Sequence, residues 1–408
     1  MRKEYEVIVV GAGPSGAMTA ALLARQGHDV LLLDKEHFPR DKVCGDGVPS
    51  KVLNLLCSFG MKEKIEKAIE SGEFNPINHM SLISPKGYRM SLPVAKGEYG
   101  FHSCVAPRFY LDSLIQQFAE KEGADFYPLK VEKPLIEKNQ VVGVQVKEKN
   151  TTFPIKAKIV VGADGVSSAV TRGLRTTKHI EKHRILAIRA YIEGIKTQPH
   201  STEVYLYRKI IPGYAWIFPL SENRANLGLG MRLDHCRKKG YSLKTMLEEF
   251  LAMPQIKCRL KQGWKLHDFA SWPLNLGSQQ NLKYIFNGAL LVGDAAGFVD
   301  PLTGGGIHTS LLSGQLAAKV IHKALLRRDV SEAALRQYEE LCCTQILKKL
   351  RNAYYIQSVL LYFPFLADIF LYLSQKNNLL AKSLFKQKIT FCENIDGSNS
   401  PQVNRDDN

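Results

Sequence analysis

Three glycines near the N-terminus have the spacing of a phosphate-binding turn. Gly11, Gly13 and Gly16 follow the apolar segment 6–10 and precede an apolar helical pattern at 17–25. In such a turn the first glycine permits the tight bend, the second lets a pyrophosphate approach the backbone, and the third allows close helix packing. The helix N-terminus offers free N–H groups and partial positive charge to the phosphates. The spacing therefore predicts a dinucleotide site.

An acidic residue supports this prediction. Asp34 lies near the end of the next apolar segment, 29–35, where a carboxylate can accept hydrogen bonds from ribose hydroxyls. The alternative is a glycine turn beside a solvated acid, and the combination of strand, helix and acid argues against it. The pattern is typical of NAD and FAD sites alike, so it does not choose between them.

Two later segments narrow the choice of cofactor. Segments 162–165 (GADG) and 293–296 (GDAA) each end a buried apolar strand, and the second precedes the glycine-rich segment 300–307. Three motifs in this order resemble those of the FAD-dependent superfamily of para-hydroxybenzoate hydroxylase, over about residues 5–330. The resemblance implies a Rossmann-type fold that binds FAD.

The same resemblance implies roles for individual residues. Asp294 would bind the ribityl chain, and the backbone N–H groups of Gly306 and Ile307 would face the N1/O2 edge of the flavin, where a helix N-terminus stabilises negative charge. Arg108 would contact the cofactor; otherwise it is a surface arginine, as Asp164 is otherwise a turn aspartate. The expected cofactor-binding residues are Gly11, Gly13, Pro14, Ser15, Gly16, Asp34, Lys35, Cys44, Gly45, Gly47, Arg108, Val131, Asp164, Gly293, Asp294, Gly305, Gly306 and Ile307.

Further segments resemble a narrower family. The run FPRDKVCGDGVPSKVL at 38–53, the aromatic segment 212–219 and the ANLGLG strand at 225–230 are similar to the geranylgeranyl reductase family, which saturates double bonds of isoprenoid chains. The resemblance implies that Cys44 lies beside the flavin, and Cys44 is our candidate for the catalytic proton donor. Without the resemblance, Cys44 is more simply a small buried residue.

The aromatic segment supplies the expected substrate site. Tyr214, Trp216 and Phe218 fall on one face of a strand, and the resemblance implies that they line a lipid channel. Core packing is the alternative, because aromatic residues favour strands anyway. Only Gly213 separates Pro212 from Tyr214, where archaeal members often have two residues, so the chain length and head group of the substrate stay open.

The expected reaction is hydride transfer from reduced FAD to an alkene, with a proton from the protein. No second GxGxxG unit follows a strand, so NADPH would dock transiently or ferredoxin would supply the electrons. His308 follows the glycine run, but helix-start packing explains it, and we do not expect it to be catalytic. A flavin-dependent hydroxylase and a non-catalytic lipid escort are the alternative functions.

The elements that must position these residues form an α/β protein. A Rossmann-type FAD-binding domain is expected to carry an inserted antiparallel-sheet substrate domain and a helical C-terminal region. The expected boundaries are 1–80, 101–183 and 281–330 for the FAD-binding domain, 81–100 and 184–280 for the substrate domain, 331–392 for the helical region and 393–408 for a disordered tail.

Composition restricts the partners and the compartment. The formal charge of +16 favours nucleic acid or an anionic membrane, but no nucleic-acid module is present and the basic residues are scattered, so nucleic acid is not expected. The eight cysteines show no zinc-like spacing and no metal is expected, which fits reduced thiols in the cytoplasm. No secretory leader is expected, because glycines interrupt the apolar segment 7–24.

The apolar run 358–373 is interrupted by Pro364 and Asp368, which argues against a transmembrane helix. It predicts either an interfacial helix at the inner face of the membrane or a buried lid. The flanking basic residues suited to anionic head groups are Lys348, Lys349, Arg351, Lys376, Lys382, Lys386 and Lys388.

Overall fold

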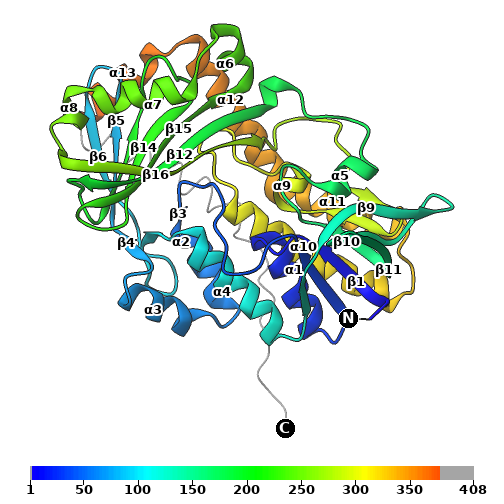
Figure 1. The fold of residues 1–408 in the computed structure, drawn as a ribbon. Helices are drawn as coiled ribbons and strands as arrows, with labels where there is room; N and C mark the ends of the chain where they lie inside the picture. The colour runs from blue at the N-terminus through cyan, green and yellow to red at the C-terminus, as the bar shows by residue number, and fades with distance from the viewer. Residues whose placement is uncertain (1, 377–408) are drawn as a thin grey trace.

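The computed structural model describes residues 2–376, and two large β-sheets with their covering helices make up most of it (Figure 1). The expected tail at 393–408, the end of the expected helical region, and Lys382, Lys386 and Lys388 lie outside the described residues. The mixed α/β fold predicted from the sequence is confirmed.

The first sheet contains the N-terminal motif. Its central strands are parallel and almost fully buried, because helices cover both faces, and this explains their unbroken apolar runs. In spatial order the sheet contains β17 (Ile285–Phe286), β18 (Ala289–Leu291), β11 (Thr151–Gly162), β1 (Glu4–Val10), β2 (Val30–Asp34) and β8 (Asp125–Pro128), and the edge strand β17 is antiparallel to β18. Strand β11 also continues into an antiparallel meander with β10 (Gln140–Glu148) and β9 (Lys130–Glu137).

Helix α1 (Pro14–Arg25) packs between α4 (Arg108–Lys121) and α10 (Ile307–Leu326). The approach of α1 to α10 is close: a Cβ on Gly314 would lie 2.5 Å from the carbonyl oxygen of Ser15. The late helix α10 therefore returns to the N-terminal unit, and it brings the glycine-rich segment before it to the phosphate-binding turn.

The second sheet is antiparallel at every neighbouring pair except one. In spatial order it contains β16 (Leu260–Asn275), β12 (Arg184–Ile195), β15 (Arg224–Arg232), β14 (Tyr214–Pro219), β13 (Ser201–Tyr205), β5 (His79–Ile83) and β6 (Arg89–Pro93). In the sheet predicted to be antiparallel, one pair is parallel: β13 pairs with β5, which enters from the N-terminal part of the chain. The strands expected at 81–100 thus join this sheet.

Helices cover one face of the second sheet. They are α6 (Leu233–Lys239), α7 (Leu243–Ala252) and α8 (Pro254–Lys257), shown above the green strands in Figure 1. Met246 and Phe250 of α7 are buried with Ala215 and Ile217 of β14 in one core. The alternate residues of β14 are therefore left to face the other way.

The segment between β2 and β8 also forms a small third sheet with two short helices. The sheet contains β3 (Gly47–Val48), β7 (Ser103–Val105) and β4 (Asn75–Ile77), and it lies beside α2 (Ser50–Ser58) and α3 (Lys62–Glu70). The remaining helices are α5 (Ala169–Leu174), η1 (Glu181–His183), α9 (Gly293–Ala296), α11 (Glu332–Cys342), η2 (Cys343–Leu347), α12 (Lys348–Tyr362) and α13 (Phe365–Lys376).

Pro364 separates α12 from α13, as its position in the apolar run suggests. Within residues 2–376, no single helix is long and apolar enough to cross a membrane. The helical segments 332–362 and 365–373, bent by 103°, pass that test together by length and composition alone.

Candidate active site

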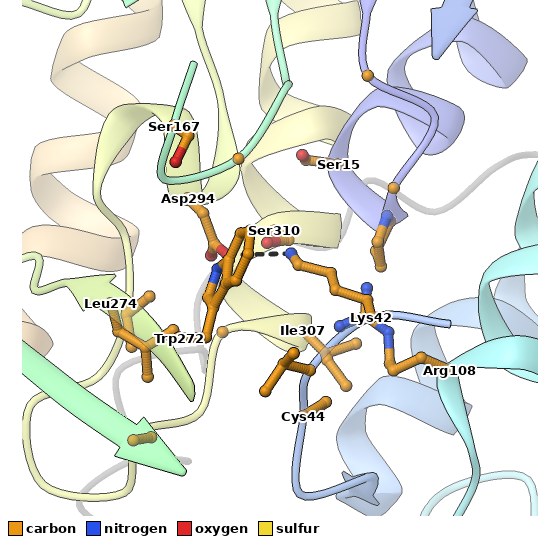
Figure 2. Close-up of a pocket in the computed structure, with 18 of the residues that line it drawn as sticks. Ser15, Lys42, Cys44, Arg108, Ser167, Trp272, Leu274, Asp294, Ile307 and Ser310 are labelled. Atoms are coloured by element: carbon orange, nitrogen blue, oxygen red, sulfur yellow. Dashed lines mark hydrogen bonds and ion pairs between the residues drawn. The ribbon is translucent and has the colours of Figure 1, made fainter. Parts of the chain in front are cut away.

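A cavity of about 750 Å³ lies between the first sheet and the second. Its lining combines the glycine turn after β1, the loop containing Cys44, the rings of β14 and the start of α10. Figure 2 shows that the labelled side chains around it come from segments far apart in the sequence. The predicted cofactor residues and the predicted substrate residues thus share one space.

The glycine turn is built as its spacing predicts. Gly11 has a φ of 102°, and a Cβ there would overlap the carbonyl group of Ala163 at the end of β11. Gly13 has no such constraint, because the nearest atom to a Cβ would be Nη2 of Arg40 at 3.7 Å. Space in front of Gly13 is open to the cavity, which suits a pyrophosphate close to the backbone.

Asp34 both faces the cavity and holds the turn. Its Oδ2 accepts a hydrogen bond of 2.8 Å from the N–H of Ala12, and its Oδ1 accepts one of 3.1 Å from the N–H of Glu36. Arg40 lies 3.8 Å from the same Oδ2. An acid at the end of β2 is therefore fixed where a ribose would lie.

Arg108 is not a surface arginine, because it is 4% exposed and lines the cavity. Its Nε and Nη2 donate to the two carboxylate oxygens of Asp112 at 2.6 and 2.8 Å, and Nη1 of Arg40 donates to Oδ2 of Asp112 at 2.6 Å. Burial opposes ionisation of Asp112, but the two arginines hold its pKa below the ordinary value. Arg40 and Arg108 therefore share the carboxylate of Asp112, Arg40 also lies near Asp34, and these acidic partners fix both guanidinium groups in the cavity wall.

Two aspartates occupy the opposite side. Oδ2 of Asp164 accepts from the N–H of Ala169 at 2.6 Å, while its buried Oδ1 has no partner among the described residues. Nζ of Lys42 lies 3.2 Å from Oδ2 of Asp294, and Figure 2 shows this side chain reaching across the cavity. Burial raises the pKa of Asp164. An unsatisfied acceptor in a cavity wall suits a ligand with hydroxyl groups.

The second glycine motif also needs its glycine. Gly293 has a φ of 56°, and a Cβ there would lie 2.6 Å from Oγ of Ser15. Gly306 caps α10, whose first residue, Ile307, lines the cavity. The N-terminus of a long helix thus points its free N–H groups at this space, as anion stabilisation requires.

The lining fits FAD. Open backbone at Gly13 suits the pyrophosphate, the carboxylate of Asp34 suits a ribose, and the orphaned oxygen of Asp164 suits a hydroxyl group. The N-terminus of α10 suits the charged edge of a reduced flavin.

The turn that contains Cys44 packs against the aromatic strand. A Cβ on Gly45 would lie 3.3 Å from Nε1 of Trp216, and one on Gly47 would lie 3.1 Å from the ring of Phe218. The centroids of the Tyr214 and Trp216 rings are 5.9 Å apart, and those of Trp216 and Phe218 are 6.3 Å apart. The three rings therefore form a continuous surface beside Cys44.

Trp216 also makes a polar contact that strand alternation does not predict. It is 7% exposed, and its Nε1–H donates to Oδ1 of Asn226 at 2.9 Å. Nδ2 of Asn226 donates to the carbonyl oxygen of Cys44 at 2.7 Å. Trp216 therefore supports the Cys44 turn as well as lining the cavity.

The matched family decides what kind of protein this is. The FAD binding domain family matches residues 4–352, which is most of the chain. A digeranylgeranylglycerophospholipid reductase of Methanocella arvoryzae is 34% identical over 370 residues, covering 88% of this chain and 88% of that protein. The chain belongs to the geranylgeranyl reductase family of FAD-dependent oxidoreductases.

Solved structures agree with this assignment. A geranylgeranyl bacteriochlorophyll reductase-like protein of Thermoplasma acidophilum is 26% identical, with a TM-score of 0.76 and coverage of 87% of each chain. A flavin-dependent brominase is 19% identical, with a TM-score of 0.75 over 93% of this chain and 92% of its own, which shows the shared fold alone. The predicted family and the predicted FAD-dependent oxidoreductase are thus confirmed.

In this member of the geranylgeranyl reductase family, most of the predicted site residues line one cavity. Those that line it are Gly11, Gly13, Pro14, Ser15, Asp34, Lys35, Cys44, Gly45, Arg108, Val131, Asp164, Tyr214, Trp216, Phe218, Asp294, Gly306 and Ile307. Gly16, Gly47, Gly293 and Gly305 are outside the lining. Gly16 lies against Gly11 and Ala163, which is a helix-packing role. His308 is also outside it, and burial lowers its pKa to about 3, so it is neutral at pH 7.

Sequence analysis missed several polar residues of this reductase-family site. Arg40 and Lys42 lie within the FPRDKVCGDG run, so their place beside the recognised cysteine was a usable signal. Arg189, Tyr191 and Asn226 lie in strands with mostly apolar neighbours, and Arg189 and Asn226 are buried there. Their partners are far away in the sequence, and no local pattern identifies them.

Proposed function

We propose that this protein reduces carbon–carbon double bonds in the isoprenoid chains of a lipid, with FAD as its cofactor. The observation that supports this most is the position of Cys44, which lies between the glycine-rich cofactor side and the rings of β14. The relatives named as digeranylgeranylglycerophospholipid reductases support the same class of substrate.

When bound, reduced FAD would supply hydride to one alkene carbon. The residues of the chain supply the other requirements. Tyr214, Trp216 and Phe218 offer an apolar surface that orients an isoprenoid and excludes water. Cys44 is half-buried, and burial raises the pKa of its thiol, so at neutral pH it carries a proton for the second alkene carbon.

The test is anaerobic reoxidation of the reduced flavoprotein by an isoprenoid lipid. The expected product is heavier by two hydrogens for each bond saturated. In a parallel reaction under labelled O₂, the product should contain no labelled oxygen. Cys44→Ser should slow the reaction at least tenfold while FAD stays bound, because a hydroxyl is a far weaker acid than a thiol. Incorporation of labelled oxygen would establish a hydroxylase and reject this proposal.

The electrons would come from NADPH or from ferredoxin. Stopped-flow bleaching of the oxidised flavin by each donor, at equal concentration, distinguishes them.

We also propose that the enzyme works as a peripheral protein at the cytoplasmic face of an anionic membrane. Large apolar side chains are exposed on α12 and α13, including Tyr355 at 63% and Tyr362 at 76%. Arg351 lies near them on α12. Exposed apolar surface of this kind beside basic residues suits an acidic lipid surface better than bulk water.

Flotation with vesicles tests this second proposal. Binding to vesicles that contain anionic lipid should weaken as salt is added, because exposed charges are screened. Replacing Tyr355 and Tyr362 with serine should reduce binding, whereas Ile136→Ser, an exposed apolar residue on β9, should not. Equal binding to neutral and anionic vesicles would reject the electrostatic part.

A further inference from the structure

Asp46 occupies an unusual position beside Cys44. It has no exposed surface, and its φ of 60° places it in the left-handed region, which aspartate and asparagine tolerate better than most residues. Its backbone N–H donates to Sγ of Cys44, with 3.3 Å between the two atoms. The backbone conformation of Asp46 therefore fixes where the thiol points.

The carboxylate of Asp46 is held from the second sheet. Its Oδ2 accepts a hydrogen bond of 2.6 Å from the hydroxyl of Tyr191 on β12, and another of 2.8 Å from Nδ2 of Asn226 on β15. The same Nδ2 binds the carbonyl oxygen of Cys44, and Oδ1 of Asn226 accepts from Trp216. One asparagine thus bridges the cysteine, its neighbouring acid and the aromatic surface.

A second contact anchors the same loop. Nη2 of Arg189 on β12 donates to Oδ2 of Asp41 at 2.5 Å, and the Arg189 guanidinium lies 4.5 Å from the ring of Tyr191. Two residues two positions apart on β12 therefore hold both ends of the segment 41–46. Hydrogen bonds between these buried polar groups offset the cost of removing them from water.

We propose that Asp46 is a positioning residue for Cys44, which aims the thiol at the cavity and keeps it protonated until it donates. This inference rests on the proposed function, in which Cys44 gives a proton to the substrate. In that step the S–H bond breaks, the proton goes to the alkene carbon that does not receive hydride from reduced FAD, and the thiolate then takes a proton from water.

The electrostatics agree with this geometry. Burial is the largest cause that raises the pKa of Cys44, and the charge of Arg108 lowers it. The carboxylate charge of Asp46 raises this pKa, whereas the hydrogen bond from the Asp46 backbone N–H lowers it. Burial raises the pKa of Asp46 to about 6, against the hydrogen bonds from Tyr191 and Asn226 and the charge of Arg189, while Asp41 adds to the rise. Above pH 6 the carboxylate is therefore ionised, and a negative neighbour opposes thiolate formation.

Asp46→Asn tests the inference, because asparagine keeps the size and tolerates the left-handed backbone. The measurement is the rate of iodoacetamide alkylation of Cys44 between pH 5 and 10, followed by peptide mass spectrometry on the intact FAD-loaded protein without substrate. The exposed Cys258 is the internal reference. We expect Cys44 alkylation at pH 7 to rise about tenfold, which corresponds to a fall of one unit in the thiol pKa.

Tyr191→Phe is the second variant, and it keeps the inference testable if Asp46→Asn does not fold. Loss of the hydroxyl removes a donor to the carboxylate, so the pKa of Asp46 should rise above about 6 and the Asp46-dependent inflection in Cys44 alkylation should move to higher pH. The matched control is Tyr207→Phe, because Tyr207 donates to Oε2 of Glu249 at 3.0 Å outside the cavity lining.

Two results would overturn the inference. One is a Cys44 alkylation profile in Asp46→Asn that superimposes on that of the unmodified protein. The other is an equal change at Cys44 and Cys258, which would indicate general loosening. Unchanged turnover in Cys44→Ser would instead reject the donor role in the proposed function, and the two failures are distinguishable because alkylation needs no substrate.

Discussion

The two sides of the cavity are built by different means. On the side of the first sheet, the turn at Gly11 and Gly13, the end of β11 and the N-terminus of α10 present backbone groups to the cavity, beside the side chains of Asp34 and Arg108. On the side of the second sheet, the rings of β14 and the side chain of Arg189 line the cavity, while Tyr191 and Asn226 bind Asp46 outside this lining. A backbone site requires small residues at fixed spacing, whereas a side-chain site depends on contacts between distant strands.

The largest expected effect is on the backbone side. Gly13→Leu should abolish FAD binding, with affinity reduced about ten-thousandfold, because the side chain would fill the space that a pyrophosphate needs. The purified variant should be colourless and should not take up added FAD in a fluorescence titration.

This variant should nevertheless fold. The nearest atom to a Cβ on Gly13 would be a flexible arginine terminus at 3.7 Å, so no backbone has to move. The control is the circular dichroism spectrum and melting temperature of the apoprotein. A yellow Gly13→Leu protein with normal flavin content would show that FAD binding does not require the open backbone at Gly13.

The same difference explains how far the sequence could predict the molecule. The glycine turn, Asp34, Asp294 and the start of α10 are parts of continuous motifs, so their place in one site was predictable. The bridge from Asn226 to Asp46 joins residues 180 positions apart. Its geometry depends on the register of β15 against β12 and β14, which no local pattern sets.

The fold shows the same limit. The sequence predicted a strand-rich second domain, but the parallel pairing of β5 with β13 depends on the route of the chain between the two sheets. The break at Pro364 was predictable because proline lacks the N–H that a helix interior needs. Local sequence patterns therefore predicted individual elements, but they did not predict which distant strands pair.

An intermediate effect is expected on the side-chain side, where Trp216 has two roles. Trp216→Ala should destabilise the protein by about 3–5 kcal/mol, because a nearly buried ring is lost. Trp216→Phe keeps most of the apolar surface and removes only the donor to Asn226, so it should cost about 1–3 kcal/mol by leaving a buried oxygen unpaired. Urea unfolding of the apoproteins measures both values.

The pair of variants also separates lining from support. Trp216→Phe should change lipid affinity little but should alter the alkylation rate of Cys44, because Asn226 then holds the Cys44 carbonyl less firmly. Phe218→Leu is the comparison, since no hydrogen bond joins that ring to the turn. An unaltered Cys44 alkylation rate in Trp216→Phe would show that Trp216 lines the cavity but does not support the Cys44 turn.

The smallest expected effect concerns two histidines, His179 and His183, at the contact between the two sides. His179 is half-buried and His183 is buried. Burial, with nearby cations, lowers the pKa of His179 to about 3 and that of His183 to about 4. His179 packs against Gly297 after α9, and Nδ1 of His183 lies 2.8 Å from Oγ of Ser278. Because the folded pKa values lie below the ordinary 6.5, the unfolded chain binds more protons in acid, and stability should be lost as pH falls below 6.5.

At pH 5 the contribution of His179 to this loss should be about 1–2 kcal/mol, which urea unfolding at pH 7 and pH 5 can resolve. Asp46 acts in the opposite direction, since its folded pKa of about 6 lies above the ordinary value and its protonation stabilises the fold as pH falls. His179→Gln isolates the histidine: its free energy of unfolding should depend less steeply on pH between 7 and 5 than that of the unmodified protein. His79→Gln, at an exposed histidine, is the matched control for the change of residue type. If both variants lose as much free energy of unfolding between pH 7 and pH 5 as the unmodified protein, protonation of His179 is not the cause of the acid sensitivity.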